Sequence, residues 1–285
     1  MSAANRTARD LGPDDLVWDH FSRPREDDVV GRIHAASKAG FAAIGLFFSE
    51  WAAHRDDPVW VDAVDAALDE TGIVIANIEA LRGWASPDHA TETCLAHEAI
   101  VWEMADRFTC RYLQVIGDYT GTVAEAGVGF GALCDRGADH GMLVGLEAVP
   151  SMTNIGTLAL ATEIVERAGR DNGGICFDSW HLTRSTNDLD DIAIVGGDRI
   201  FATQFNDGTI APQMDDYYID CLSNRVSPGR GEFALVDMVR RLDELGSKAP
   251  IGLEVCSTEL WELPVDEAAR IVADDMRAVL AEARG

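Results

Sequence analysis

The chain has 285 residues, of which 47% are hydrophobic and 25% charged, a composition typical of a globular protein with a sizeable core. Its 49 acidic residues outnumber its 23 basic ones, and the formal net charge is −26. Sequence-independent binding to nucleic acid or to anionic membranes requires a basic surface, so this charge argues against both kinds of partner. We therefore expect a small-molecule substrate.

The distribution of apolar residues and cysteines indicates a cellular location. Residues 1–15 are polar and contain no apolar segment typical of a signal peptide, and no apolar run approaches the length of a membrane span. The chain contains no CxxC pair, which favours reduced thiols over disulfides or zinc knuckles. The six cysteines are Cys94, Cys110, Cys134, Cys176, Cys221 and Cys256. The sequence predicts a cytoplasmic protein.

The first half of the chain alternates short apolar runs with amphipathic segments. Runs with the length and composition of buried strands cover residues 16–20, 41–48, 73–78 and 112–116. Segments with apolar residues at helical spacing follow them at residues 29–39, 58–71, 90–108 and 123–140. Gly40 and Gly72 end the first two helices. Three glycines between residues 127 and 131 weaken the helical pattern of the fourth.

The second half repeats the alternation. Strands are predicted at residues 142–146, 174–178, 200–203 and 251–253, and helices at residues 155–168, 189–195, 233–245 and 265–283. Residues 208–230 are irregular and too long for a simple turn. Loops of this length inside compact domains usually cover active sites, so we expect this segment to lie over one.

Eight strands, each followed by a helix, favour a single (β/α)8 TIM barrel over residues 1–285, with residues 208–230 over its mouth. The alternative is an open doubly wound sheet. That fold would be expected to carry a glycine-rich phosphate loop such as GxGxxG after the first strand, and the sequence has none there.

Four consecutive strands of the second half end in a residue that can bind a hard metal ion: Glu147, Asp178, Gln204 and Glu254. The carboxyl ends of barrel strands converge on one mouth, so these side chains should meet. Three carboxylates and an amide oxygen suit Mn²⁺ best, with Mg²⁺ and Co²⁺ as alternatives, and do not suit a thiolate-bound zinc. Taken singly, each of the four residues could be an ordinary polar residue at the end of a strand. Their common register across four strands argues against that reading.

Several segments of the chain resemble a known family, the xylose isomerase-like barrels, often labelled sugar phosphate isomerase/epimerase. They are LEAVP around Glu147, CFDSWH around Asp178, QFND after the seventh strand, RVSPGRGEF, and LEV around Glu254. The resemblance covers nearly the whole chain and is strongest over residues 141–257. It implies a metal held by Glu, Asp, His and Glu, of which Glu147, Asp178 and Glu254 match. Gln204 stands where many members have histidine. A glutamine at this position is similar to what bacterial 3-dehydroshikimate dehydratases of the same superfamily carry. The phosphodiester nuclease branch of the superfamily has several extra histidines that bind three metal ions. This chain has only seven histidines, mostly on helical segments, so it is unlike that branch.

The resemblance also implies substrate contacts. His181, three residues after Asp178, would face the substrate, and Arg225 would reach a substrate oxygen. The alternatives are a solvent-exposed loop histidine and a surface arginine on a loop. Arg82, just past the third strand, could pair with a substrate carboxylate in bidentate fashion. By position, His54 is also expected at the mouth, and Trp180 as part of an apolar wall against a sugar-like ring.

The chemistry expected of such a site begins with removal of a proton next to a substrate carbonyl, giving an enediolate that a metal ion stabilises. In an isomerase or epimerase, Glu147 and Glu254 would exchange protons on opposite sides of that carbon. In a dehydratase acting on 3-dehydroshikimate or a keto-inositol, the same enolate would expel a β-hydroxyl with help from His181 or His54. Isomerases and epimerases make up much of the family, which favours that reaction. The two arginines Arg82 and Arg225, together with Gln204, favour the dehydratase.

A non-catalytic sugar-binding barrel with a structural metal is a weaker alternative, because a structural role does not explain oxygen-rich ligands in a barrel mouth. By analogy with barrels of this kind, a homo-oligomer that pairs through loops at the mouth is compatible with the sequence.

Overall fold

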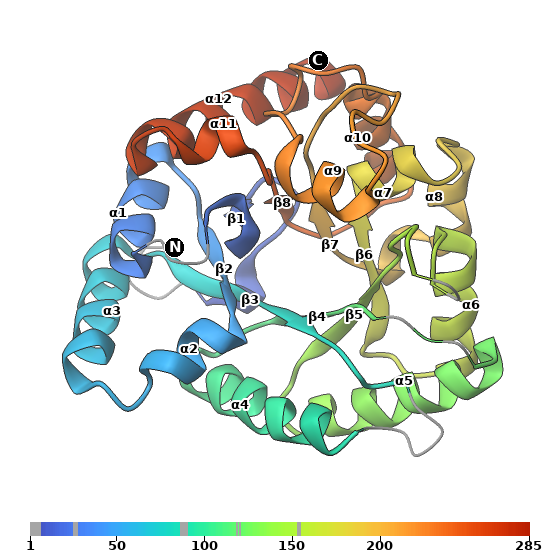
Figure 1. The fold of residues 1–285 in the computed structure, drawn as a ribbon, viewed down its shortest axis with the longest axis horizontal. Helices are drawn as coiled ribbons and strands as arrows, with labels where there is room; N and C mark the ends of the chain where they lie inside the picture. Colours follow the sequence, from blue (N-terminus) through green and yellow to red (C-terminus); the bar gives the residue numbers. More distant parts are fainter. Residues whose placement is uncertain (1–6, 25–27, 86–90, 118, 120, 153–154) are drawn as a thin grey trace.

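The computed structural model describes residues 7–24, 28–85, 91–117, 119, 121–152 and 155–285 (Figure 1). Eight parallel strands form one sheet in the order β7-β6-β5-β4-β3-β2-β1-β8. The sheet closes where the Phe205 N–H donates to the Gly252 carbonyl at 2.8 Å and the Glu254 N–H donates to the Phe205 carbonyl at 3.2 Å. The fold is a (β/α)8 TIM barrel in a single domain, as the sequence predicted.

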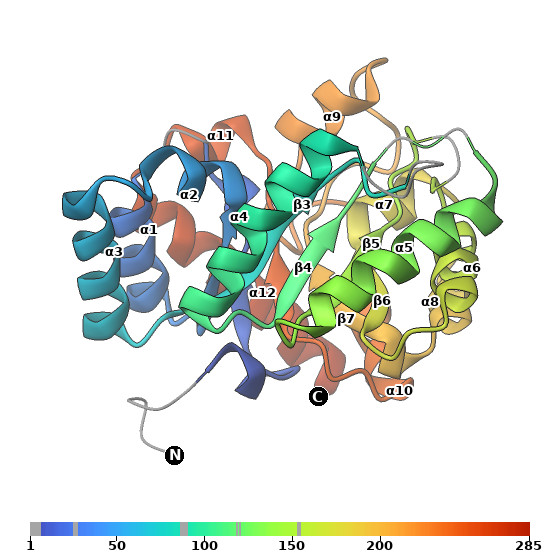
Figure 2. The same cartoon turned by 90° about the horizontal axis from the view of Figure 1, so that it is seen from below.

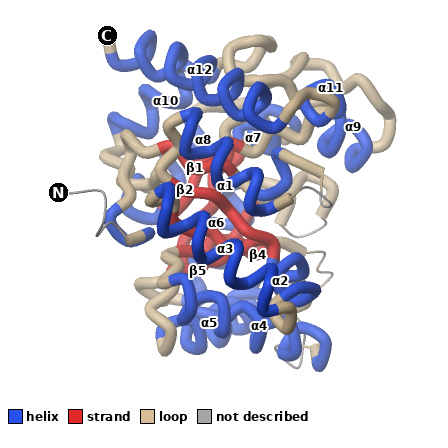
Figure 3. The backbone as a smooth tube through the Cα atoms, turned by 90° about the vertical axis from the view of Figure 1, so that its left-hand side faces the viewer, coloured by secondary structure: helices blue, strands red, loops and turns tan. Residues whose placement is uncertain are grey.

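The strands are short and mostly buried, and the long helices surround them (Figures 1 and 3). The strands are β1 (Leu16–Trp18), β2 (Ala43–Phe47), β3 (Val74–Leu81), β4 (Tyr112–Val115), β5 (Leu143–Glu147), β6 (Gly173–Asp178), β7 (Ile200–Gln204) and β8 (Ile251–Leu253). The longer helices are α1 (Val29–Ala39), α3 (Pro58–Thr71), α4 (Glu92–Phe108), α5 (Val123–Ala138), α6 (Leu158–Ala168), α10 (Leu235–Glu244) and α12 (Val265–Arg284). Shorter helices are α2 (Phe48–His54), α7 (Ser179–Arg184), α8 (Asp190–Val195), α9 (Tyr217–Ser223) and α11 (Thr258–Trp261), with 3₁₀ turns η2 (Ala8–Asp10), η3 (His20–Ser22) and η4 (Gly197–Arg199).

Local sequence signals explain why the predicted boundaries hold. Helix α3 begins where the Asp57 carboxylate accepts hydrogen bonds from two backbone N–H groups and Pro58 occupies the first turn. It ends at Gly72, whose φ of 71° is a left-handed conformation that glycine adopts without a steric penalty. All eight predicted strands and the eight predicted helices are present, with ends that shift by up to three residues.

Helix α5 is continuous despite its glycines. Thr122 and Glu125 form a capping box at its start. A Cβ atom at Gly127 would lie 2.7 Å from the Cβ of Arg167 on α6, which is closer than real carbon contacts allow. The glycine therefore permits α5 and α6 to pack closely, and this tertiary contact outweighs its poor helix propensity.

Short helices at the barrel mouth are the main elements that the sequence pattern did not predict. Helices α2 and α7 start directly after β2 and β6, and α9 lies within the irregular residues 208–230. In the side view, α2, α9 and α11 lie at one end of the barrel, opposite α10 and the C-terminus (Figure 2). Among the described residues, no helix is both long and apolar enough to cross a membrane.

Candidate functional site

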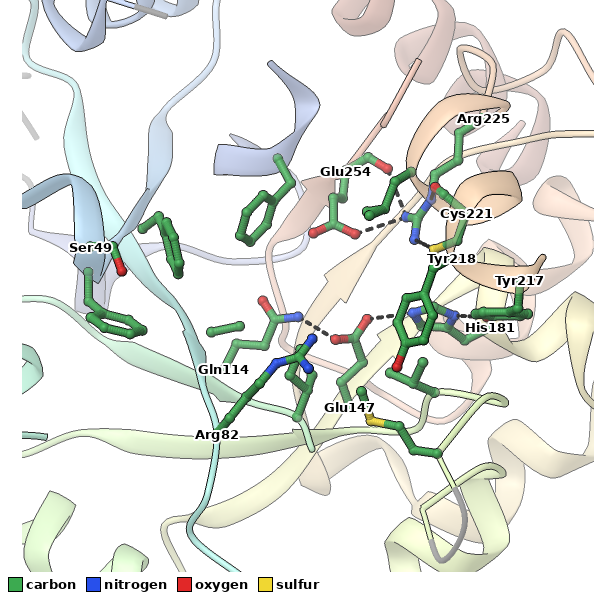
Figure 4. Close-up of a pocket in the computed structure, with 18 of the residues that line it drawn as sticks. Ser49, Arg82, Gln114, Glu147, His181, Tyr217, Tyr218, Cys221, Arg225 and Glu254 are labelled. Atoms are coloured by element: carbon green, nitrogen blue, oxygen red, sulfur yellow. Dashed lines mark hydrogen bonds and ion pairs between the residues drawn. The ribbon is translucent and has the colours of Figure 1, made fainter. Parts of the chain in front are cut away.

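A cavity of about 310 Å³ lies among the residues that follow the strand ends (Figure 4). One wall is aromatic and comes from the β1–β2 side, with Phe21, Phe47 and Phe48 packed ring against ring. The opposite side is polar. It carries Arg82, Gln114, Glu147, His181, Arg225 and Glu254. The cavity thus joins an apolar half to a half rich in ionisable groups.

Glu147 is the last residue of β5, and both of its carboxylate oxygens have partners. Oε2 accepts a hydrogen bond of 2.5 Å from the Gln114 side-chain amide. Oε1 lies 3.0 Å from Nε2 of His181. Although the residue is only 3% exposed, it lines the cavity. The barrel therefore holds this carboxylate in a fixed orientation toward the cavity.

Asp178 ends β6 and also caps α7. Its Oδ1 accepts from the backbone N–H groups of Trp180 at 2.6 Å and His181 at 3.1 Å, while Oδ2 accepts from Nη1 of Arg225 at 3.0 Å. Burial acts to raise the pKa of Asp178, but the Arg225 guanidinium, His181 and these hydrogen bonds outweigh burial and lower it. Asp178 is thus an ionised carboxylate in the fold.

Arg225 is buried between two carboxylates. Its Nη1 lies 3.0 Å from Asp178 Oδ2 and 2.9 Å from Glu254 Oε2. Two further hydrogen bonds hold the guanidinium from α9, since Nε donates to the Cys221 carbonyl and Nη2 to the Cys221 sulfur. Burial alone would lower the pKa of Arg225, but Asp178 and its other anionic neighbours raise it well above its ordinary value. Arg225 is a fixed internal cation.

Glu254 follows β8, and its second carboxylate oxygen accepts a hydrogen bond from Gln204, the last residue of β7. The Gln204 amide nitrogen donates to Glu254 Oε1 at 3.1 Å and to Gln114 at 3.2 Å. Burial raises the pKa of Glu254 well above its ordinary value; Arg225 opposes this rise, while Glu147 and Asp178 add to it. The raised pKa favours the protonated form of Glu254, which reduces the repulsion among these carboxylates.

His181 lies over the site from the first turn of α7. Its Nδ1 is 2.5 Å from the Tyr217 hydroxyl, and the two rings stack with their centroids 6.0 Å apart. One possible ligand atom each from Glu147, Asp178 and His181 lie within 4.8 Å of one another. Carboxylate oxygens and an imidazole nitrogen are common ligands of divalent ions, so the donor set fits a divalent metal ion.

A second buried acidic pair lies in the first half of the barrel. Asp19 follows β1, and Glu79 lies on β3. Asn77 donates to one oxygen of Asp19 at 2.7 Å, and the backbone N–H of His20 donates to one oxygen of Glu79 at 3.3 Å. Burial raises the pKa of Glu79 to about 7 and that of Asp19 well above its ordinary value. At Asp19 the negative charges of Glu79 and Glu254 add to the rise.

The structure brings most of the predicted site residues together. Glu147, Glu254, His181, Arg225 and Arg82 line the cavity. Asp178 and Gln204 lie behind them and are hydrogen-bonded to Arg225 and Glu254, respectively. Strand-end position predicted this grouping for Glu147, Asp178, Gln204, Glu254 and Arg82. The expectation for His181 and Arg225 came from the family resemblance.

Two residues expected to contact substrate lie elsewhere. Trp180 is fully buried, with its ring under the guanidinium of Arg184 at 4.0 Å and against Phe233. His54 ends α2 and stacks on Trp60, with ring centroids 5.0 Å apart. The expectation for both is corrected, because position after a strand does not determine which way a side chain points once a short helix begins there.

Several lining residues were not foreseen. Gln114 is a polar residue in the apolar strand β4, and period-two alternation around it could have identified it as facing the barrel interior. Tyr217 and Tyr218 belong to α9, within the irregular segment. No local signal in the sequence links these two tyrosines to the cavity.

Comparisons with known proteins agree with this geometry. A family model described as "Xylose isomerase-like TIM barrel" matches residues 33–281. An inosose isomerase of Bacillus velezensis is 28% identical over 154 residues, which are 53% of this chain and 52% of that protein. A 3-dehydroshikimate dehydratase of Pseudomonas aeruginosa is 29% identical over 149 residues, which are 52% of this chain and 23% of that protein. The match thus spans about half the length of the inosose isomerase, and less of the dehydratase.

Among solved structures, the IOLI protein with a bound zinc atom superimposes with a TM-score of 0.78 at 18% identity. The match covers 94% of this chain and 98% of that one. At this identity the similarity establishes the fold, and the chemistry of the site has to be argued from its own residues.

Proposed function

Because the chain belongs to the xylose isomerase-like TIM barrel family, we propose that it is a divalent-metal-dependent isomerase or epimerase that transfers a proton next to a substrate carbonyl. The substrate would be a ketone of the sugar or polyol class. The observation that carries this proposal is that Glu147 and Glu254, from β5 and the end of β8, both reach the same cavity (Figure 4). Two carboxylates on one cavity can serve as proton acceptor and proton donor.

Glu147 and Asp178 belong both to the set expected from the sequence and to the cluster in the structure, so they would hold the ion. When bound, a divalent ion supplies a Lewis acid that polarises the carbonyl and stabilises the negative charge of the enediolate. We propose Mn²⁺ as the ion, with Mg²⁺ or Co²⁺ as alternatives, on the composition of the ligand set.

The chain's own groups would direct the proton transfer. Gln114 and His181 orient the Glu147 carboxylate, and Arg225 and Gln204 orient that of Glu254. The raised pKa of Glu254 suits a group that holds a proton and releases it during turnover. In an epimerase, one glutamate would remove the proton and the other would return one from the opposite face.

A second candidate is a dehydratase acting on a carboxylated ring, in which the same enolate expels a β-hydroxyl. Arg82 lines the cavity and offers a guanidinium to a substrate carboxylate. The aromatic wall of Phe21, Phe47 and Phe48 would face the carbon skeleton of such a ring. Arg82 is therefore the residue whose role best separates the two candidates.

The test is to incubate the metal-loaded protein with ketoses, keto-inositols and 3-dehydroshikimate in deuterated buffer. Deuterium incorporation without a new ultraviolet chromophore supports an isomerase or epimerase; a conjugated product supports the dehydratase. Glu147→Gln and Glu254→Gln should each lose activity, whereas Glu259→Gln, at an exposed position on α11, should retain it. Exchange that persists in either of the first two variants would contradict the proposal.

We further propose that the protein is cytoplasmic and that it forms homo-oligomers. All six cysteines are buried free thiols, in keeping with a reducing compartment. Analytical ultracentrifugation would establish the oligomeric state.

A further inference from the structure

We propose that the substrate is a ketone of the sugar or polyol class that carries an aromatic substituent, and that the apolar half of the cavity binds this substituent. The inference rests on the proposed function and narrows its substrate class. The reacting end would lie against Glu147 and Glu254, while the substituent would lie between the aromatic wall and helix α9. The evidence is the chemistry of the cavity lining outside its ionisable groups.

The aromatic wall is larger than a single sugar ring requires. The ring centroids of Phe21 and Phe47 are 5.2 Å apart, and those of Phe47 and Phe48 are 5.0 Å apart. The imidazole of His97 on α4 also lines the cavity and lies 4.8 Å from the Phe48 ring, which extends the wall. One aromatic side chain can cover the C–H face of one sugar ring. Adjoining rings offer a larger apolar surface, which suits a second ring without hydroxyl groups.

A free ketose or polyol fits this half of the cavity poorly. Such a molecule has a hydroxyl or carbonyl group on nearly every carbon. A hydroxyl placed against an apolar wall loses its hydrogen bonds to water and gains none in return. On the side of the aromatic wall, Ser49 and His97 supply the polar side-chain atoms that the described residues bring to the cavity. The part of the substrate that lies here is therefore expected to be apolar.

Helix α9 brings further apolar surface from the other side of the cavity. Figure 4 shows Ser49, which directly follows Phe48 in the chain, across the cavity from Tyr218. Tyr218 and Leu222 both line the cavity, yet their side chains are 39% and 45% exposed. They are four residues apart and so lie on one face of α9. Apolar side chains that are exposed around a cavity mark a surface that a ligand covers. A substituent between α9 and the aromatic wall would remove both side chains from water.

The geometry of the wall favours an aromatic substituent over an alkyl chain. The rings of Phe21 and Phe47 are inclined by 54°, and those of Phe47 and Phe48 by 64°. Inclined rings attract each other because the positive edge of one faces the negative face of the next, and this attraction adds to that of apolar burial. A further aromatic ring can continue this arrangement, whereas an alkyl chain gains from burial alone.

The cavity has room for both parts of such a substrate. Its volume of about 310 Å³ lies within the range of about 300–1,000 Å³ that is typical of pockets for drug-sized molecules. A single six-carbon ketone at the carboxylates would leave the apolar half to water, to which apolar side chains offer no hydrogen bonds. A second ring would displace that water and cover the apolar side chains.

Binding is tested with glycosides that lack a ketone and cannot react. Titration calorimetry on the metal-loaded protein compares phenyl β-glucoside with methyl β-glucoside, and we expect the phenyl compound to bind at least about 10-fold more tightly. Tyr218→Ala and Leu222→Ala should each weaken binding of the phenyl compound at least about fivefold through lost apolar contact. Ile219→Ala is the matched control, because Ile219 lies on the same helix, is 50% exposed and is outside the cavity lining.

Three outcomes of these titrations would overturn the inference. Equal losses in Leu222→Ala and Ile219→Ala would contradict the placement of the substituent. A hexyl β-glucoside that binds as tightly as the phenyl compound would contradict its aromatic character. If Leu222→Ala changed the sedimentation coefficient of the protein and left binding of the phenyl compound unaltered, the exposed face of α9 would instead be a contact with a second copy of the chain.

Deuterium exchange separates this inference from the proposed function. The phenyl and methyl glucosides, each oxidised to a ketone at one ring carbon, are incubated with the unaltered metal-loaded protein in deuterated buffer, beside a free ketose. Exchange at least about 10-fold faster in the phenyl compound supports the inference. Equal rates for the two glycosides, or exchange in the free ketose alone, would overturn it and leave the proposed function intact. Absence of exchange in every ketone would overturn the proposed function as well.

Discussion

The barrel contains two buried acidic clusters, and their carboxyl groups have different partners. In the second half, Arg225 lies within 3.0 Å of both Asp178 and Glu254. In the first half, the charge of Glu79 acts on Asp19, and the nearby Arg32 donates to His20 at 2.8 Å and to the Gly45 carbonyl at 3.0 Å. Asp19, Glu79 and Asp178 are all nearly or fully buried. Burial therefore does not by itself determine their charge.

The difference teaches that a neighbouring cation lowers the pKa of a buried carboxyl only where it outweighs burial and nearby negative charge, since Glu254 contacts the same guanidinium as Asp178 and keeps a raised pKa. Asp178, in direct contact with a guanidinium, has a lowered pKa. Glu79, for which burial outweighs the charge of Arg32, has a pKa raised to about 7. The first cluster can hold a proton at neutral pH, while Asp178 in the second offers an anion to a metal or substrate.

The largest expected effect comes from removing the cation of the second half. Arg225→Gln should reduce the free energy of unfolding by about 3–5 kcal/mol, because it leaves two buried carboxylates without their shared partner. Urea unfolding at pH 7 measures this change. A loss below about 1 kcal/mol would show that the two clusters do not differ in their need for a cation.

The next effect concerns the pH dependence of stability in the first half. The folded state holds the Glu79 proton up to a pH of about 7, whereas an unfolded glutamate with the ordinary value of 4.5 has already lost it. The folded state therefore binds more protons in this window, and stability falls as pH rises through it, by up to about 3 kcal/mol. Glu79→Gln should remove this slope. Urea unfolding at pH 5, 6, 7 and 8 compares the two proteins, and equal slopes would contradict the prediction.

A smaller loss of stability is expected from placing a methyl group at Gly45, against the Glu79 carboxylate. A Cβ atom at Gly45 would lie 1.9 Å from Glu79 Oε1 and 3.1 Å from the backbone nitrogen of His20. Gly45→Ala should therefore cost about 1–3 kcal/mol through overpacking. Gly12→Ala is the control, because nothing lies within 4 Å of its Cβ position. Thermal unfolding distinguishes them, and equal midpoints would count against a tightly packed first cluster.

The smallest effect is expected at an exposed ion pair. Arg230 contacts Asp275 with its side chain 55% exposed. Arg230→Gln should change the free energy of unfolding by less than about 1 kcal/mol, because solvent screens the pair and still reaches the Asp275 carboxylate after the change. The measurement is the same urea titration used for Arg225→Gln. A cost similar to that of the buried arginine would mean that burial is not what makes Arg225 important.

Much of the fold and part of the site followed from the sequence. The eight strands were predicted because each is a short apolar run. Helix α3 was predicted to the residue because its apolar residues follow helical spacing and Gly72 marks its end. Glu147, Asp178 and Gln204 were placed together because parallel barrel strands present their carboxyl ends on one side. Side-chain direction was harder to predict. Trp180 follows a ligand candidate by two residues, yet α7 turns it into the core.

The sequence by itself determined the barrel, its acidic character and the mouth at which the polar residues gather, because apolar periodicity and strand order are encoded locally. Only the tertiary structure decided how the charges pair. Arg225 reaches Asp178 across 47 residues and Glu254 across 29. Gln204 turns its amide nitrogen toward Glu254, and His181 approaches Glu147. These pairings depend on distances across the closed barrel, which no local pattern contains.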